Sequence, residues 1–122
     1  MIFASQSYII YGPLLAGIPT VIFEGTPDSP TPAIWWQIVE KYGVTVLFSA
    51  PTAMRVLRKF PEEWLKQSDI SSLRYIFIAG ELLDEPTYQW ATAALGKQIL
   101  DHYWQTESGV HVYMGVCQNC EK

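Results

Sequence analysis

Nine residues, Asp101 to Gly109, place two large aromatic rings, a hydroxyl, an amide and two carboxylates directly after a short apolar run. That run, Gln98–Leu100, is typical of a buried strand bounded by turn residues. If it belongs to a parallel sheet, the side chains that follow it emerge at the carboxyl edge, where open α/β sheets bind their ligands. The segment therefore indicates a binding site. The alternative is an ordinary strand-to-loop transition whose two aromatic side chains are anchored in the core.

Two other polar segments follow apolar runs in the same way. Ser49–Thr52 comes after one run, and Ala79–Glu81 comes after the next. Backbone amides and a threonine hydroxyl suit phosphate oxygens, and a carboxylate suits a hard cation such as magnesium. Together the segments favour a nucleotide site. The alternative is that Glu81 and Glu107 cap helices or face water, as carboxylates usually do.

The elements that would position these residues alternate along the chain. Apolar runs bounded by turn residues predict strands, and amphipathic stretches between them predict helices. Near-continuous apolar strands are typical of a mostly parallel sheet with helices on both faces, so the predicted class is α/β. Strands are expected at 20–24, 44–48, 74–79, 98–100 and 110–116, and helices at 5–16, 32–42, 51–59, 61–66 and 85–95.

Several residues mark the ends of these helices. Thr31 and Asp84 are expected to cap helices, and Gly43 and Gly96 to end them. The first helix is apolar nearly all round and is expected to be buried, with a kink or break at Gly12-Pro13.

The composition limits the kinds of partner. The chain has 122 residues, of which 49% are hydrophobic and 16% charged, and its formal net charge is -4. No lysine or arginine precedes Lys41, which argues against a nucleic-acid or anionic-membrane surface. The basic residues of the central segment, Arg55, Arg58, Lys59 and Lys66, are interpreted as a solvated helix face.

The apolar stretch from Tyr8 to Phe23 is too short and too interrupted by glycine and proline for a spanning helix. No basic segment precedes it, so a signal peptide is not expected. Cys117 and Cys120 form a single C-x-x-C, which indicates a reducing, cytosol-like compartment. With His102 and His111 these cysteines form a weak zinc pattern, which we keep as an alternative.

Six short blocks occur in order along the chain. They are Ser7-Tyr8 with Tyr11-Gly12-Pro13-Leu14, Phe23-Glu24-Gly25, Ser49-Ala50-Pro51-Thr52-Ala53, Ser71-Ser72-Leu73-Arg74, Ala79-Gly80-Glu81 and Tyr103-Trp104-Gln105-Thr106-Glu107. Together they closely resemble the AMP-forming acyl-CoA synthetases of the short-chain acetate and propionate branch. The propionyl-CoA synthetase subgroup looks nearest, through residues 83–87 and 101–104. The resemblance covers about residues 7 to 109, so we expect a partial AMP-binding domain over 1–109 and a divergent tail over 110–122.

The resemblance implies a two-step ligase reaction. A small carboxylate attacks the α-phosphate of ATP-Mg to give an acyl-adenylate and pyrophosphate, and the thiol of coenzyme A then displaces AMP. Chemistry of this kind depends on positioning and on cations that neutralise negative charge. The implied ligands are ATP or AMP, Mg²⁺, coenzyme A and propionate or acetate.

The resemblance also implies roles for individual residues. Ala79 and Trp104 would form the acyl pocket, with alanine mildly favouring propionate. Glu107 would hold magnesium, and Asp28 would lie near coenzyme A. The residues implied to line the nucleotide are Gly80, Glu81 and Leu82 beside the adenine, and Asp101, His102, Tyr103, Trp104, Gln105 and Thr106 below it, with Thr106 at the α-phosphate.

The family's lysine-bearing phosphate loop, ribose-binding aspartate and mobile C-terminal domain do not occur in this sequence. We therefore expect a fragment of the substrate-binding core that does not turn over alone and that associates with the missing synthetase parts. The expected compartment is the cytoplasm, or the mitochondrial matrix in a eukaryote. The rival hypothesis is a non-catalytic module that binds nucleotide or acyl-adenylate.

Overall fold

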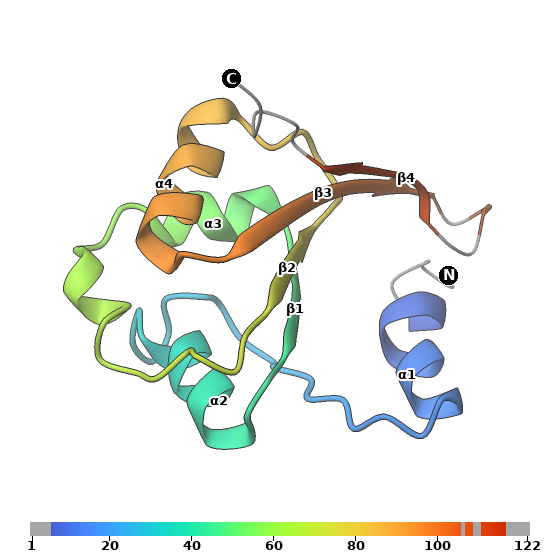
Figure 1. The fold of residues 1–122 in the computed structure, drawn as a ribbon, viewed down its shortest axis with the longest axis horizontal. Helices are drawn as coiled ribbons and strands as arrows, with labels where there is room; N and C mark the ends of the chain where they lie inside the picture. The colour runs from blue at the N-terminus through green and yellow to red at the C-terminus, as the bar shows by residue number, and fades with distance from the viewer. Residues whose placement is uncertain (1–5, 106, 109–110, 117–122) are drawn as a thin grey trace.

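Four strands form one sheet in the order β1-β2-β3-β4 (Figure 1). The computed structural model describes residues 6–105, 107–108 and 111–116. Strands β1, β2 and β3 run parallel, and β4 pairs with β3 in the antiparallel direction. The predicted α/β class with a mostly parallel sheet is therefore confirmed. The strands are β1 Val46–Ser49, β2 Tyr75–Ile78, β3 Gln98–Trp104 and β4 His111–Val116.

The helices follow the predicted alternation closely. The 61–66 helix shortens to a single 3-10 turn, and the 5–16 helix is π-helical over its first part. The helical segments are Gln6–Tyr11 (π), α1 Gly12–Leu15, α2 Ile34–Tyr42, α3 Pro51–Leu57, Glu62–Trp64 (3-10) and α4 Glu85–Leu95.

Three of the four predicted helix ends are confirmed by their hydrogen bonds and dihedrals. The Asp84 side chain accepts a hydrogen bond from the Thr87 backbone N–H at the start of α4. Gly43 and Gly96 end α2 and α4 in the left-handed conformation, each with φ of 60°, which glycine adopts at low cost. The prediction that Thr31 caps α2 is wrong, because the helix starts later, with Ala33 at its cap position, and the Thr31 hydroxyl accepts from the Ala33 N–H in the turn before it, at 3.3 Å.

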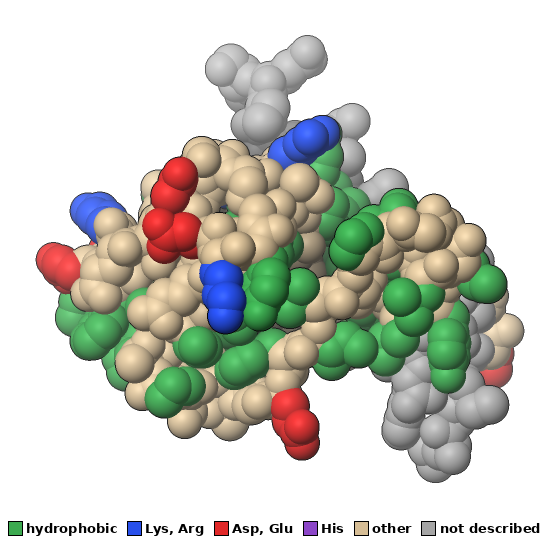
Figure 2. All heavy atoms as spheres, turned by 90° about the horizontal axis from the view of Figure 1, so that it is seen from below, with side chains coloured by type: hydrophobic (Ala, Val, Ile, Leu, Met, Phe, Trp, Pro, Cys, Tyr) green, Lys and Arg blue, Asp and Glu red, His purple; other side chains and the backbone are tan. Residues whose placement is uncertain are grey.

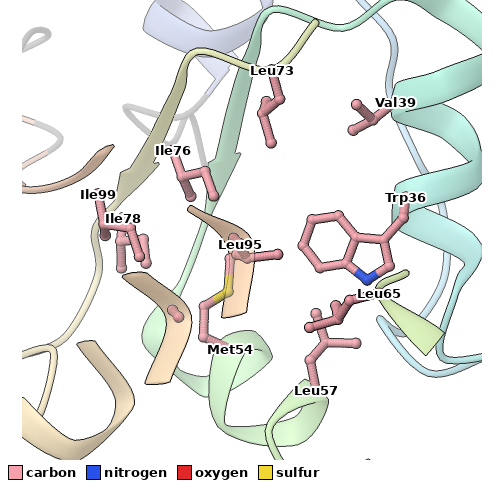
Figure 3. Packing of buried hydrophobic residues seen from close by; sticks show 11 residues of the cluster. Trp36, Val39, Met54, Leu57, Leu65, Leu73, Ile76, Ile78, Leu95 and Ile99 are labelled. Atoms are coloured by element: carbon pink, nitrogen blue, oxygen red, sulfur yellow. The ribbon is translucent and has the colours of Figure 1, made fainter. Parts of the chain in front are cut away.

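The core lies on one face of the sheet. The β2 side chains Ile76 and Ile78 are fully buried there, because alternate residues of a strand point to the same face. Helices α2, α3 and α4 cover this face, and the indole of Trp36 from α2 points into the space between them (Figure 3). Helix α1 lies on the other side of the sheet (Figure 1). The buried cluster comprises Trp36, Val39, Met54, Leu57, Leu65, Leu73, Ile76, Ile78, Ala91, Leu95 and Ile99.

Two expectations for the N-terminal part are wrong. Residues 20–24 are not a strand in this structure, and the 5–16 helix is not buried, since α1 contributes no buried residue. A β-branched run favours extended backbone, but a strand also needs a partner for its N–H and C=O groups, and residues 20–24 join no ladder among the described strands. Figure 2, which views the molecule from below, shows hydrophobic side chains at many places on that surface. The exposed large hydrophobic residues of the N-terminal part include Tyr11, Leu14, Leu15, Ile18, Val21 and Ile22.

The strand predicted at 98–100 is too short. We expected the chain to leave the sheet at Leu100, but β3 continues to Trp104. Its second half pairs with β4, with Asp101 opposite Gly115 and Tyr103 opposite Tyr113. The β4 backbone therefore satisfies groups that the prediction left in a loop. Within the part of the chain that the structure describes, no helix has the length and apolarity needed to cross a membrane.

Replacing buried Ile76 with alanine should lower the free energy of unfolding by about 2–5 kcal/mol, because it removes core contacts and leaves a cavity. Its side chain is 0% exposed. The matched control is Ile22→Ala, the same substitution at a side chain that is 66% exposed, and it should change the stability by less than about 0.5 kcal/mol. Urea unfolding followed by tryptophan fluorescence measures both. Equal losses in the two variants would contradict the placement of the core.

Candidate functional site

The three segments that sequence reasoning assigned to one edge do lie at one edge. In the parallel register, Ser49 of β1 pairs with Ile78 of β2, and Ile78 pairs with Asp101 of β3. The segment after β1 therefore enters α3 beside the segment that follows β2. The Ala79 N–H also donates to the Ser49 carbonyl at 3.2 Å, which extends the pairing one residue past β2.

Glu81 is bound on both carboxylate oxygens. Its Oε1 accepts hydrogen bonds from the Thr52 N–H, at 3.1 Å, and from the Thr52 hydroxyl. Its Oε2 forms an ion pair of 2.7 Å with Nη1 of Arg55. The hydrogen bonds of Thr52 and then of Arg55 lower the pKa of Glu81. Ala50, at the start of α3, makes no side-chain cap, so Glu81 caps that helix from a distant part of the sequence.

Arg55 joins the segment after β1 to the segment after β2. Its Nε lies 2.6 Å from Oδ1 of Asp84, its Nη1 binds Glu81, and its Nη2 donates to the Leu82 carbonyl at 2.9 Å. The prediction of a solvated face holds for Arg58, Lys59 and Lys66, which are exposed. Arg55 is also partly exposed, at 36% of its side chain, but it is bound in this network, which the prediction did not foresee. Thr52 and Arg55 are three residues apart and so lie on one face of α3, which is the signal that could have revealed this contact.

Asp84 links this network to α4. Its Oδ2 accepts from the Thr87 N–H at 3.1 Å and from the buried Thr87 hydroxyl at 2.8 Å. The Thr87 hydroxyl bond, followed by that of Arg55, lowers the pKa of Asp84 to about 2. Arg58, one turn further along α3, donates to the same Thr87 hydroxyl at 3.4 Å.

These contacts recur at a constant spacing in the sequence. Thr52, Arg55 and Arg58 follow one another at intervals of three residues, and so do their partners Glu81, Asp84 and Thr87. Each pair is separated by 29 residues in the sequence. We call this set of three contacts the α3 ladder. It fixes the start of α4, and the loop before it, against one face of α3.

The loop over Gly80–Leu82 lies at the surface. Gly80 has φ of 104°, a conformation that residues with a Cβ rarely adopt, and the space beside its Cα is open. Leu82 is 82% exposed. The exposed surface of this loop therefore includes the Gly80 backbone as well as the Leu82 side chain.

An aromatic row lies on the sheet face opposite the core. It consists of Phe48, Phe77, His102 and Trp104. The Phe48 and Phe77 rings stack at 5.0 Å, the Phe48 and Trp104 rings lie nearly parallel at 6.5 Å, and His102 meets Trp104 edge-on at 5.1 Å. Trp104 is half-buried and His102 is buried. Sequence reasoning found His102 and Trp104 but missed the two phenylalanines, which alternate with core residues in their strands.

Ala79 lies on the same side as the aromatic row. Alternation along the extended backbone from Phe77 places it there, and it is 8% exposed. Ala79 and Trp104, which the resemblance assigns to one acyl pocket, therefore share a face of the sheet.

Asp101 points to the opposite face, between β3 and the loop before α4. Burial raises the pKa of its carboxyl, and a backbone hydrogen bond from Leu83 opposes that rise. Tyr103 is exposed, and its hydroxyl donates to the Gln105 side chain at 3.1 Å. The Gln105 carbonyl in turn accepts from the Ser108 hydroxyl at 2.8 Å, which closes the turn after β3.

The remaining predicted site residues are less closely tied to this edge. Thr106 lies outside the described residues. Glu107 is exposed in the turn after β3, where one carboxylate is compatible with a magnesium ion that also binds phosphate and water. Asp28 is half-buried in the loop before α2, and no hydrogen bond or ion pair among the described residues connects it to the three edge segments.

The zinc alternative gains no support from the part of the chain that the structure describes. No group of three potential metal ligands occurs there. His102 belongs to the aromatic row, and Cys117 and Cys120 lie outside the described residues. The zinc pattern therefore stays a prediction from the sequence alone.

The stability of the fold should depend on ionised Asp84. Its pKa in the folded chain, about 2, is below its ordinary value of 3.8, so its contribution is present above about pH 4 and is lost as the pH falls toward about 2. Asp84→Asn keeps a good helix cap but should reduce the fall in the urea midpoint between about pH 5 and pH 2. Glu63→Gln, at an exposed carboxylate of the 3-10 turn, is the control. An equally steep fall in Asp84→Asn would contradict the prediction.

Comparison with known proteins gives one family. Residues 1–122 match the model of the family described as AMP-binding enzyme. The chain is 56% identical over 104 residues to the propionate–CoA ligase of Salmonella typhimurium and 54% identical over 104 residues to that of Escherichia coli. It is 48% identical over 110 residues to the acetyl-coenzyme A synthetase of Dictyostelium discoideum.

These alignments cover 85%, 85% and 88% of this chain, respectively, but only 17%, 17% and 16% of the relatives. The chain thus spans about one sixth of the length of the relatives it matches. The resemblance to the short-chain acyl-CoA synthetases is confirmed, whereas the division at residue 109 stays a prediction. The chain belongs to the AMP-binding enzyme family.

Proposed function

We propose that this chain forms part of the nucleotide and acyl site of an acid–thiol ligase. Such a ligase activates a short-chain carboxylate with ATP to an acyl-adenylate and transfers the acyl group to coenzyme A. The observation that carries the proposal is the shared edge of β1, β2 and β3, where the segments resembling the family lie together. The names of the relatives, propionate–CoA ligase and acetyl-coenzyme A synthetase, support the substrate class.

The adenine would lie against the backbone of the exposed residues Gly80, Glu81 and Leu82. The backbone there is fixed before a ligand arrives, since Arg55 binds the Leu82 carbonyl and the Glu81 carboxylate. A fixed loop loses little conformational freedom on binding. Leu82 stands where the family usually has proline, and this change has little effect if only the backbone meets the base.

The floor of the nucleotide site would run from Asp101 to Thr106, with Thr106 donating to the α-phosphate. Glu107 would hold Mg²⁺, which supplies neutralisation of phosphate charge when bound. The ring contacts of Trp104 with Phe48 and His102 restrict its indole, so it can serve as a rigid wall. A closed apolar wall also keeps water away from a reactive acyl-adenylate.

The wall formed by Trp104 and Ala79 would limit the acid to a few carbons. Alanine leaves more room than valine, and one methylene in such a pocket changes discrimination by ~1–3 kcal/mol. We therefore propose propionate, with acetate also accepted. Asp28 would contribute to the coenzyme A side from the loop before α2.

The activity of the whole ligase would need groups outside this chain. We propose that the chain binds ligands but does not turn over alone, and that it associates with the other parts of a synthetase. No nucleic acid or membrane partner is proposed, because the formal net charge of the chain is -4. The proposed compartment is the cytoplasm, or the mitochondrial matrix in a eukaryote.

Isothermal titration with AMP and with non-hydrolysable propionyl- and acetyl-adenylate analogues tests this function. The acyl analogues should bind more tightly than AMP because they also fill the acyl pocket. Ala79→Val should weaken the propionyl analogue relative to the acetyl analogue by about 10- to 200-fold, the range for one methylene in a tight pocket.

The ratio of the two affinities separates pocket size from general destabilisation, which would weaken both analogues alike. Ala93→Val, at an exposed position of α4, is the matched control and should leave the ratio unchanged. Absence of binding heat for every adenylate at millimolar concentration would refute the proposed function for this chain.

A further inference from the structure

The Arg55 guanidinium connects three acceptors that belong to three different residues of one short segment. Its nitrogens bind Asp84 at 2.6 Å, Glu81 at 2.7 Å and the Leu82 carbonyl at 2.9 Å. The side chain is 36% exposed, so the network lies at the surface of the site rather than in the core. A planar guanidinium with five N–H donors can satisfy such a set at once, which an ammonium group cannot do.

Thr52 and Arg55 both hold the segment that precedes α4, through the Glu81 carboxylate. Gly80 allows many backbone conformations, and the Leu82 side chain is 82% exposed. The position of the loop is therefore set by its polar contacts with α3. Arg55 also reaches the backbone of the loop, since its Nη2 donates to the Leu82 carbonyl.

The geometry points to Arg55 as a positioning residue that fixes the Gly80–Leu82 backbone and thereby sets the selectivity of the site for the adenine base. This inference rests on the proposed function, because that function assigns the adenine to this loop. Arg55 itself contacts the loop from the side of α3, through the Glu81 carboxylate and the Leu82 carbonyl. Arg55 would therefore influence binding of the adenine through the position of the loop backbone, and it would not influence binding of the phosphate.

Arg74 provides the control. It is exposed, it directly precedes β2, and among the described residues no hydrogen bond or ion pair joins its side chain to the Gly80–Leu82 loop or to the α3 ladder. Arg55→Lys and Arg74→Lys make the same substitution and both keep the positive charge. They differ in whether a contact with the Gly80–Leu82 loop is lost.

The experiment compares binding of AMP, inosine monophosphate and ribose 5-phosphate to the full chain and to the two lysine variants. Arg55→Lys should weaken AMP by about tenfold, as expected for the loss of one charge-assisted hydrogen bond. It should reduce the preference for AMP over inosine monophosphate and change ribose 5-phosphate by less than about twofold. Arg74→Lys should leave all three affinities unchanged. Equal weakening of all three ligands by Arg55→Lys would overturn the inference, since a general structural effect gives that result.

Hydrogen exchange of the peptide over residues 79–84, without ligand, gives an independent readout. Arg55→Lys should speed exchange there by about tenfold, while peptides from β2 and the core of α4 keep their rates. If the unsubstituted chain binds no nucleotide, the proposed function fails and the exchange rates alone decide whether Arg55 positions the loop. Unchanged exchange in Arg55→Lys would overturn that role.

Discussion

The parallel register of β1, β2 and β3 is the constraint on which the rest of the structure depends. Each of these strands delivers its following segment to the same edge, because the strands run in one direction and pair with little offset. The start of α3, the loop before α4 and the second half of β3 are brought together in this way. This register brings Thr52 and Glu81 into contact although 29 residues separate them in the sequence. Backbone hydrogen bonding between the strands thus places the segments of the site next to one another.

The two faces of the sheet use the same strands for different purposes. One face presents Ile76 and Ile78 to three helices and forms the aliphatic core. The other presents the aromatic row, in which Trp104 is oriented by neighbouring rings. Since side chains alternate along a strand, a shift of one residue in β2 would exchange the two faces. The stability of the core and the orientation of the tryptophan are therefore fixed by one register.

Local signals predicted much of this arrangement. Asp84, Gly43 and Gly96 marked helix ends correctly, because these three caps depend on neighbouring residues. Signals that depend on distant partners were less reliable. Residues 20–24 have strand composition without a partner strand, and β3 continued past Leu100 because β4 pairs with it. Arg55 was assigned to solvent because its acceptors lie 26 to 29 residues further along the chain.

The α3 ladder has a consequence for how the loop before α4 can move. The ladder pairs Thr52 with Glu81, Arg55 with Asp84 and Arg58 with Thr87, and the spacing is the same in each pair. A shift of the loop along α3 by one residue would therefore separate all three pairs at once. Arg55 also holds Glu81 and the Leu82 carbonyl, so the same displacement would strain all of its contacts together. Because these contacts form one connected network, we expect the loop before α4 to separate from α3 cooperatively.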